Sequence, residues 1–103
     1  MNSVSLSQVV VSESGDRLYS FEYAAVLSET SITVVERFVA LGLIEPIGTM
    51  LQPSDITRIS QIQRLRQDLG LNLVGAAMVL DMAQEIAQLR AQLKAYQSQK
   101  PKT

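Results

Sequence analysis

The sequence predicts a mainly α-helical domain with a short β element at its N-terminus. Three observations support this prediction: two short helical segments joined by a polar turn, a third helix with a regular apolar stripe, and a fourth helix that is long for so small a domain. The chain has 103 residues, of which 47% are hydrophobic and 18% charged. This length and composition predict one globular core and no second independent domain.

Residues 1–18 are expected to form a β extension. They include a stretch rich in Val and Ser around Val9-Val10-Val11. Ser14-Gly15-Asp16 is a turn signal that precedes Arg17-Leu18-Tyr19. The pattern predicts a short hairpin or a single strand.

Residues 19–70 are expected to hold two short helices, a small turn and a third helix. Ser20 is a suitable N-cap for a helix over 21–27, and Ser31 for a second helix over 32–41. Gly42 stands where a left-handed C-terminal cap is expected. Two short helices with this tight polar connection are typical of a helix-turn-helix. The apolar stripe of the second helix comprises Val34, Val35, Phe38 and Leu41.

The third helix is predicted to begin at Pro53, because proline fits the first helical position. Pro46 closes the preceding unit, so residues 47–51 leave room for a reduced wing only. Gly70 is expected to end the third helix. Apolar residues recur along it every three or four positions, at Ile56, Ile59, Ile62, Leu65 and Leu69.

Residues 71–97 are expected to form a long C-terminal helix capped by Asn72, followed by a disordered tail over 98–103. Its first half is apolar on nearly all sides, which is typical of a buried helix. Its second half has the 4-3-4-3 spacing of a coiled-coil seam, which predicts a homodimer. The alternative is that this helix folds back over its own domain. The seam residues are Met82, Ile86, Leu89, Leu93 and Tyr96.

Composition excludes most enzyme classes. The chain has no Cys and no His, which removes a disulfide framework, the usual zinc ligands, a cysteine nucleophile and histidine triads. We therefore expect no enzyme, no metal and no cofactor. The longest apolar stretch, residues 73–80, is far shorter than the ~20 residues of a membrane span. With no signal peptide either, a cytoplasmic location is expected and a membrane partner is not.

The charge distribution disfavours nucleic acid as a partner. Residues 1–52 carry two arginines against six carboxylates, a net charge of −4, whereas residues 53–103 carry +3. DNA affinity comes largely from Lys and Arg that neutralise phosphates, and the helix-turn-helix lies in the acidic half. If the chain does bind DNA, Arg37, Arg58 and Arg64 are the candidates. Arginines that alternate with an apolar stripe, as Arg58 and Arg64 do, are also typical of a solvated helix face.

Two segments resemble a known family. The segment LYSFEYAAVLSETSITVVERFVALGLIEP resembles the N-terminal helix-turn-helix of MerR-type proteins, in which a Leu-Gly-Leu step closes the second helix. The segment IQRLRQDLGLNLVGAAMVLDMAQEIAQLRAQL resembles more specifically the chaperone-modulator branch, the CbpM-like proteins. Their shared run stands here as Leu69-Gly70-Leu71-Asn72-Leu73-Val74-Gly75, before a helix rich in Ala and Leu. The resemblance covers roughly residues 18–96.

The resemblance implies a winged helix-turn-helix fold of MerR type in a small cytoplasmic bacterial dimer. Such a protein binds the J-domain of a DnaJ-like, CbpA-type co-chaperone and restrains it from stimulating a DnaK-type chaperone. J-domains of that family present a basic helix, so an acidic surface is expected to bind it. The candidate partner-binding residues are Glu36, Asp81 and Glu85.

The alternative is a MerR-type transcriptional regulator that binds DNA. DNA-binding MerR proteins usually carry Arg-Tyr-Tyr in the second helix, and Glu36-Arg37-Phe38 occupies that place here. An acid therefore stands where an Arg would approach phosphate, which disfavours DNA binding. A structural adaptor with an unrelated partner is a third possibility.

Overall fold

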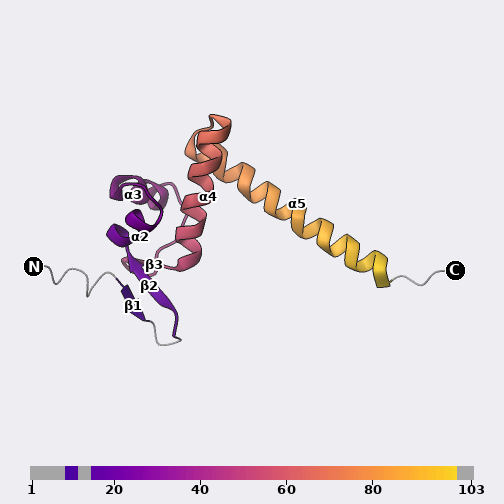
Figure 1. Ribbon diagram of the computed structural model, residues 1–103, viewed down its shortest axis with the longest axis horizontal. Helices are drawn as coiled ribbons and strands as arrows, with labels where there is room; N and C mark the ends of the chain where they lie inside the picture. Colours follow the sequence, from indigo (N-terminus) through magenta and orange to yellow (C-terminus); the bar gives the residue numbers. More distant parts are fainter. Residues whose placement is uncertain (1–8, 12–14, 100–103) are drawn as a thin grey trace, which may run out of the picture.

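The computed structural model describes residues 9–11 and 15–99 (Figure 1). A small sheet and a pair of short helices form the body, one longer helix runs beside them, and the last helix projects away as an arm. The mainly α-helical fold with a short β element and a long C-terminal helix is confirmed. In chain order the elements are β1 (Val9–Val11), β2 (Arg17–Ser20), α2 (Phe21–Leu27), α3 (Ile32–Ala40), β3 (Met50–Leu51), α4 (Pro53–Leu69) and α5 (Leu73–Gln99).

The three strands form an antiparallel sheet in the order β1-β2-β3. The hairpin that the sequence predicts is present as β1 paired with β2, although residues 12–14 of its turn lie outside the described residues. β2 continues to Ser20, two residues beyond the expected end of the β extension. The pairing of β3 with β2 is a feature that the sequence pattern does not predict.

The reduced wing is a tight hairpin that returns the chain into the sheet. The backbone N–H of Ile47 donates to the carbonyl of Met50 at 2.8 Å, and Met50 donates back at 3.1 Å. Gly48 takes the left-handed conformation that the turn requires, with φ of 63°. Leu51, the next residue, is fully buried. The wing is therefore a structural part of the body.

The two short helices begin at the predicted caps. The Ser20 hydroxyl accepts a hydrogen bond from the Tyr23 N–H at 3.0 Å, and the Ser31 hydroxyl accepts one from the Val34 N–H at 3.2 Å. α3 ends one residue earlier than expected, at Ala40. As a result Leu41 leaves the apolar stripe and is 43% exposed, which corrects its expected place in the core.

One hydrophobic core joins the helix-turn-helix to the sheet, to α4 and to the start of α5. Ala24 and Ala25 are buried on α2, where small side chains allow the helices to approach closely. Leu69, predicted to belong to the stripe of α4, is instead 56% exposed because it lies in the last turn. The other buried core residues are Val35, Phe38, Ile44, Leu51, Ile59, Ile62, Leu73, Ala76, Ala77 and Leu80.

The chain turns by 108° between α4 and α5. Gly70 ends α4 in the left-handed conformation, with φ of 68°, and Asn72 caps α5 by accepting the Gly75 N–H at 2.7 Å. Only one face of the first turns of α5 is buried, since Val74 and Met78 are 44% and 57% exposed. This corrects the expectation that the first half is buried on all sides.

From Asp81 to Gln99 every residue of α5 is exposed. The arm gives the molecule its longest dimension of 71 Å, against 38 Å and 19 Å along the other axes. Ser98 and Gln99 are helical, which corrects the predicted start of the disordered tail, and residues 100–103 lie outside the described residues. Within the described part of the chain no single helix is long and apolar enough to cross a membrane, and only the bent pair α4 and α5 together meets that test of length and composition.

We predict that Gly70→Ala lowers the free energy of unfolding by about 1 kcal/mol, because a side chain at this positive φ strains the backbone. A Cβ at Gly70 would meet no atom within 4 Å, so the loss comes from conformation and not from a clash. Gly70→Asn is the matched control, since Asn tolerates the left-handed region and should lose less. Urea denaturation of the three proteins measures the difference, and equal stability of Ala and Gly would contradict the assignment.

Candidate functional site

The functional candidates lie on surfaces of the body and of the arm. Within the described residues, no group of three or more acidic side chains is arranged to hold a metal ion. The partner and DNA candidates that the sequence predicts are distributed over three helices: Glu36 and Arg37 on α3, Arg58 and Arg64 on α4, and Asp81 and Glu85 on α5.

α3 presents one acid and one base to solvent. Glu36 and Arg37 are exposed, whereas Val35 and Phe38 on the opposite face enter the core. Beside Glu36 lies a cavity of about 430 Å³ between the starts of α2 and α3 and the strand β3. We name it the α2–α3–β3 cavity, and its lining residues are Ser20, Phe21, Glu22, Ile32, Glu36, Thr49 and Met50.

Glu22 and Met50 belong to this cavity, although the sequence pattern did not single them out. The sequence gives a weak indication of the position of Glu22, because Glu22 lies in the first turn of a helix that Ser20 caps. Met50 follows Gly48-Thr49, a turn signal between apolar residues that indicates a hairpin. Their proximity to Glu36 depends on the pairing of β3 with β2. No local sequence pattern predicts this pairing.

Arg58 and Asp81 lie together, although the sequence assigned them to different partners. The Arg58 guanidinium donates two hydrogen bonds to the Asp81 carboxylate, at 2.6 Å and 3.2 Å. Its Nε donates to the backbone carbonyl of Leu43 at 2.7 Å. We name these three groups the Arg58 clamp. It connects the loop after the helix-turn-helix with α4 and α5.

The clamp changes the electrostatics of its carboxylate. The hydrogen bond from Arg58 is the main cause that holds the pKa of Asp81 below its usual range, with a further contribution from the positive charge of Arg58, while partial burial opposes both. Of the acidic pair Asp81 and Glu85, Asp81 is thus neutralised by Arg58. The same ion pair occupies the charge of Arg58. Glu85, one turn further along α5, is exposed.

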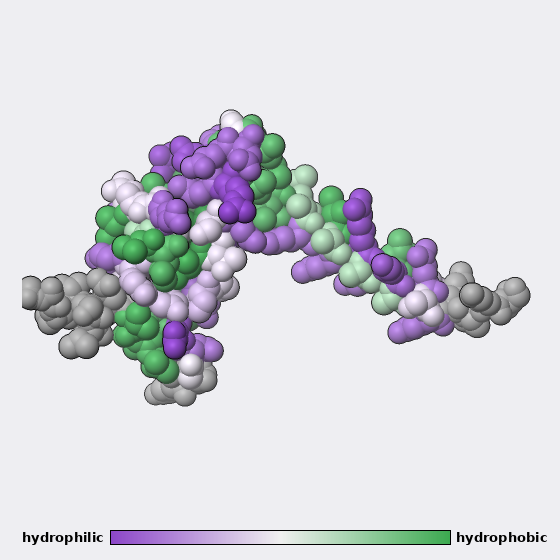
Figure 2. Space-filling model, viewed as in Figure 1, coloured by the Kyte–Doolittle hydropathy of each residue, from purple (hydrophilic) through white to green (hydrophobic). Residues whose placement is uncertain are grey.

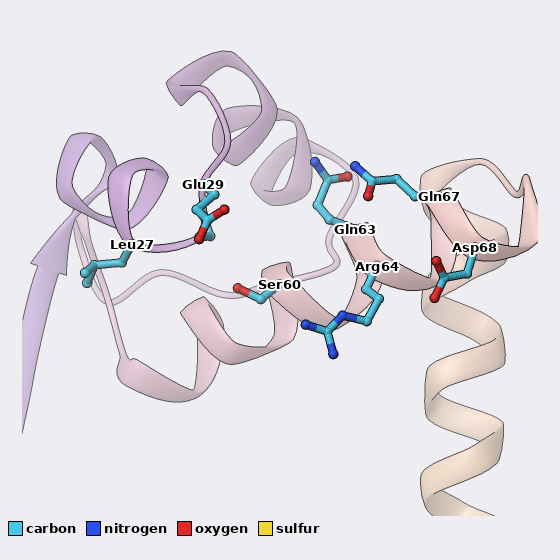
Figure 3. Close-up of a pocket in the computed structure, with 8 residues that line it drawn as sticks. Leu27, Glu29, Ser60, Gln63, Arg64, Gln67 and Asp68 are labelled. Atoms are coloured by element: carbon cyan, nitrogen blue, oxygen red, sulfur yellow. The ribbon is translucent and has the colours of Figure 1, made fainter.

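Arg64 is exposed on α4 at the edge of a polar pocket (Figure 3). The pocket has a volume of about 420 Å³ and separates α4 from the turn after α2, where Glu29 lies. Gln63 crosses this gap and donates to the Thr30 hydroxyl at 3.3 Å. The two exposed arginines that the sequence proposes for DNA binding thus lie on different helices, Arg64 on α4 and Arg37 on α3.

The predicted seam is a stripe of half-exposed side chains along the arm, where Figure 2 shows hydrophobic residues recurring. Exposed fractions run from 48% for Ile86 to 62% for Tyr96. The long helix does not fold back over its own domain, so that alternative is wrong. At the base of the arm the stripe meets an apolar groove of about 460 Å³ between α4 and α5, lined by Ile56, Leu65, Val79, Leu80 and Ala83 among others.

We predict that Arg58→Ala lowers the free energy of unfolding by about 1–2 kcal/mol, since it removes charged hydrogen bonds from a partly buried site. Arg66→Ala on the same helix is the matched control, because Arg66 is exposed and bonds only the nearby Gln63 among the described contacts. Urea denaturation at neutral pH compares the variants. Equal losses would mean that the clamp does not stabilise the fold.

The clamp also predicts an acid dependence of stability. Because the pKa of Asp81 is lower in the folded chain than in the unfolded chain, its contribution is present above about pH 4 and is lost as pH falls through the folded value. Between about pH 5 and about pH 2, Asp81→Asn should therefore lose less stability than the wild type. An equal loss of stability in the wild type and in Asp81→Asn over this pH range would contradict the stabilising role of the Asp81 carboxylate.

Comparison with known proteins places these features in a family. Residues 22–97 match the family described as MerR HTH family regulatory proteins. A protein of Streptomyces coelicolor with the name "Putative heat shock protein HspR" is 30% identical over 79 residues, which cover 72% of this chain and 52% of that protein. The chain thus spans about half the length of this relative, and no solved structure gives a significant match. The chain belongs to the MerR family of helix-turn-helix regulatory proteins.

Proposed function

We propose that this protein is a chaperone modulator that binds the J-domain of a DnaJ/CbpA-type co-chaperone and inhibits its stimulation of a DnaK-type chaperone. A regulatory role follows from the family. The finer proposal rests on the cavity of the helix-turn-helix that Glu22 and Glu36 line, in which none of the described lining residues is basic. The proposal places the protein in the cytoplasm, together with its partner.

Electrostatic complementarity supports a basic protein partner over DNA. Of the three arginines on which DNA binding would depend, Arg58 is held by Asp81 and by the Leu43 carbonyl. On α3, the helix that would enter the major groove, Arg37 stands beside Glu36. Phosphates would be repelled by the carboxylates of this face, whereas the basic helix of a J-domain would be attracted.

The second candidate is a transcriptional regulator that binds DNA. The family match favours it, because the family is defined by a helix-turn-helix, and Arg37 and Arg64 remain exposed. The relative's name, that of a heat shock protein, does not favour one candidate over the other. The two candidates differ in the charge that they require on the binding surface, which is negative for a basic J-domain helix and positive for DNA.

We further propose that the protein is a homodimer joined through the seam on α5. Two heptads are too short to form a stable coiled coil alone. Here the stripe is continuous with the apolar groove between α4 and α5, which adds buried area next to a folded body. A second copy would remove both surfaces from water.

The decisive experiment for function is a calorimetric titration of the purified protein with the J-domain of a DnaJ-like protein from the same organism. We expect saturable binding at one J-domain per subunit, and a loss of affinity for Glu36→Lys. Asp81→Lys is unsuitable as a first variant, because it would also break the Arg58 clamp.

The same protein is then tested against genomic DNA. A DNA regulator should bind selected duplexes with an affinity that falls steeply with salt and weakens in Arg37→Gln and Arg64→Gln. Absence of J-domain binding by a folded sample, together with such DNA binding, would replace the proposal with the second candidate.

We predict that Leu89→Asp converts the dimer to a monomer, since it would bury a carboxylate in the seam. Ala91→Asp is the matched control, because Ala91 lies on the opposite face of α5 and is also exposed in the single chain. Sedimentation velocity distinguishes the two states. A Leu89→Asp protein that sediments as the wild type does would refute this seam.

A further inference from the structure

We propose that the α2–α3–β3 cavity is the docking site for a basic amphipathic helix of a protein partner, with one Lys or Arg held between Glu22 and Glu36 and an apolar side chain in the cavity floor. This inference rests on the proposed function, which supplies such a helix in the J-domain. It goes further by assigning the contact to the helix-turn-helix body and not to the acidic residues of α5.

The cavity has the composition of a mixed apolar and charged contact. Its floor consists of three half-buried apolar side chains, Phe21, Ile32 and Met50. Its rim carries the exposed carboxylates of Glu22 and Glu36. A volume of about 430 Å³ has room for a few side chains and not for a whole helix, so the partner would insert residues from one face. That is how an amphipathic helix is usually bound.

Within the described residues no cation neutralises the two carboxylates. The described residues that line the cavity include no Lys or Arg. Among the described residues neither Glu22 nor Glu36 takes part in a salt bridge, and the ion pair between Arg58 and Asp81 lies elsewhere. An incoming ammonium or guanidinium group would therefore gain attraction without displacing a resident cation. Duplex DNA would meet repulsion at the same place.

Most residues that line the cavity belong to helices or strands, and Thr49 lies in the tight turn before β3, so little ordering is needed on binding. Ser20 caps α2 and pairs in the sheet with Met50, which fixes the floor relative to the first turn of α2. Ser31 caps α3 directly before Ile32. A preformed site avoids much of the entropy cost of association.

The test is calorimetric titration of a J-domain with paired charge-reversal variants. Glu22→Lys combined with Glu36→Lys should lower the affinity at least about tenfold. The matched control is Glu29→Lys combined with Glu45→Lys, which makes the same change in net charge at exposed glutamates outside the cavity. The control should stay within about threefold of the wild type. Thermal unfolding by circular dichroism verifies that both variants are folded.

A second variant tests the apolar floor independently of charge. Ile32→Gln makes the floor polar and should lower the affinity about tenfold while the salt dependence of binding stays that of the wild type. Unchanged affinity in this variant would overturn the assignment of the floor.

The outcomes separate this inference from the function on which it rests. If the wild type does not bind the J-domain, the proposed function fails, and the inference fails with it. If the wild type binds and the cavity pair weakens binding no more than the control pair, the function stands and the docking site is wrong. Loss of binding in Glu85→Lys alone would assign the contact to α5. Binding of duplex DNA through Arg37 would replace both proposals.

Discussion

A single guanidinium group connects the parts of this molecule. Arg58 lies on α4 and reaches the carbonyl of Leu43, in the loop after the helix-turn-helix, and the carboxylate of Asp81 on α5. The apolar core already packs these elements together, but apolar contacts tolerate sliding, whereas hydrogen bonds of 2.6–2.7 Å fix a direction. The angle at which α5 leaves the body thus depends on the core, on the left-handed Gly70 and on this clamp.

The clamp also determines which charges remain available to partners. It removes one arginine from a possible DNA surface and one carboxylate from a possible protein surface. The body still exposes Glu22 and Glu36, together with Arg37 and Arg64, and the arm exposes an apolar stripe with Glu85 beside it. The helix-turn-helix therefore presents carboxylates as well as an arginine to solvent, and a partner of either charge would meet both.

Local signals in the sequence were sufficient to predict which segments form helices. Ser20, Ser31, Asn72, Gly42 and Gly70 act through bonds or dihedral angles within a few residues, so a single chain segment carries the information. The spacing of apolar residues was misleading at the helix ends. Leu41 and Leu69 continue the apolar pattern of α3 and α4, but both side chains are exposed. The strand β3 was missed because two residues have no periodicity, and their partner strand lies thirty residues earlier in the chain.

The sequence by itself determined the order and type of the helices, the apolar seam and the excess of acid in the first half, because each depends on composition or on short-range spacing. Only the tertiary structure decided that Arg58 meets Asp81, that Glu22 and Glu36 share one cavity, and that the seam stays uncovered along the arm. These features join residues from 14 to 23 positions apart, or depend on the direction of a helix after a bend. Contacts of that kind are set by how the elements pack, which no local pattern of residues encodes.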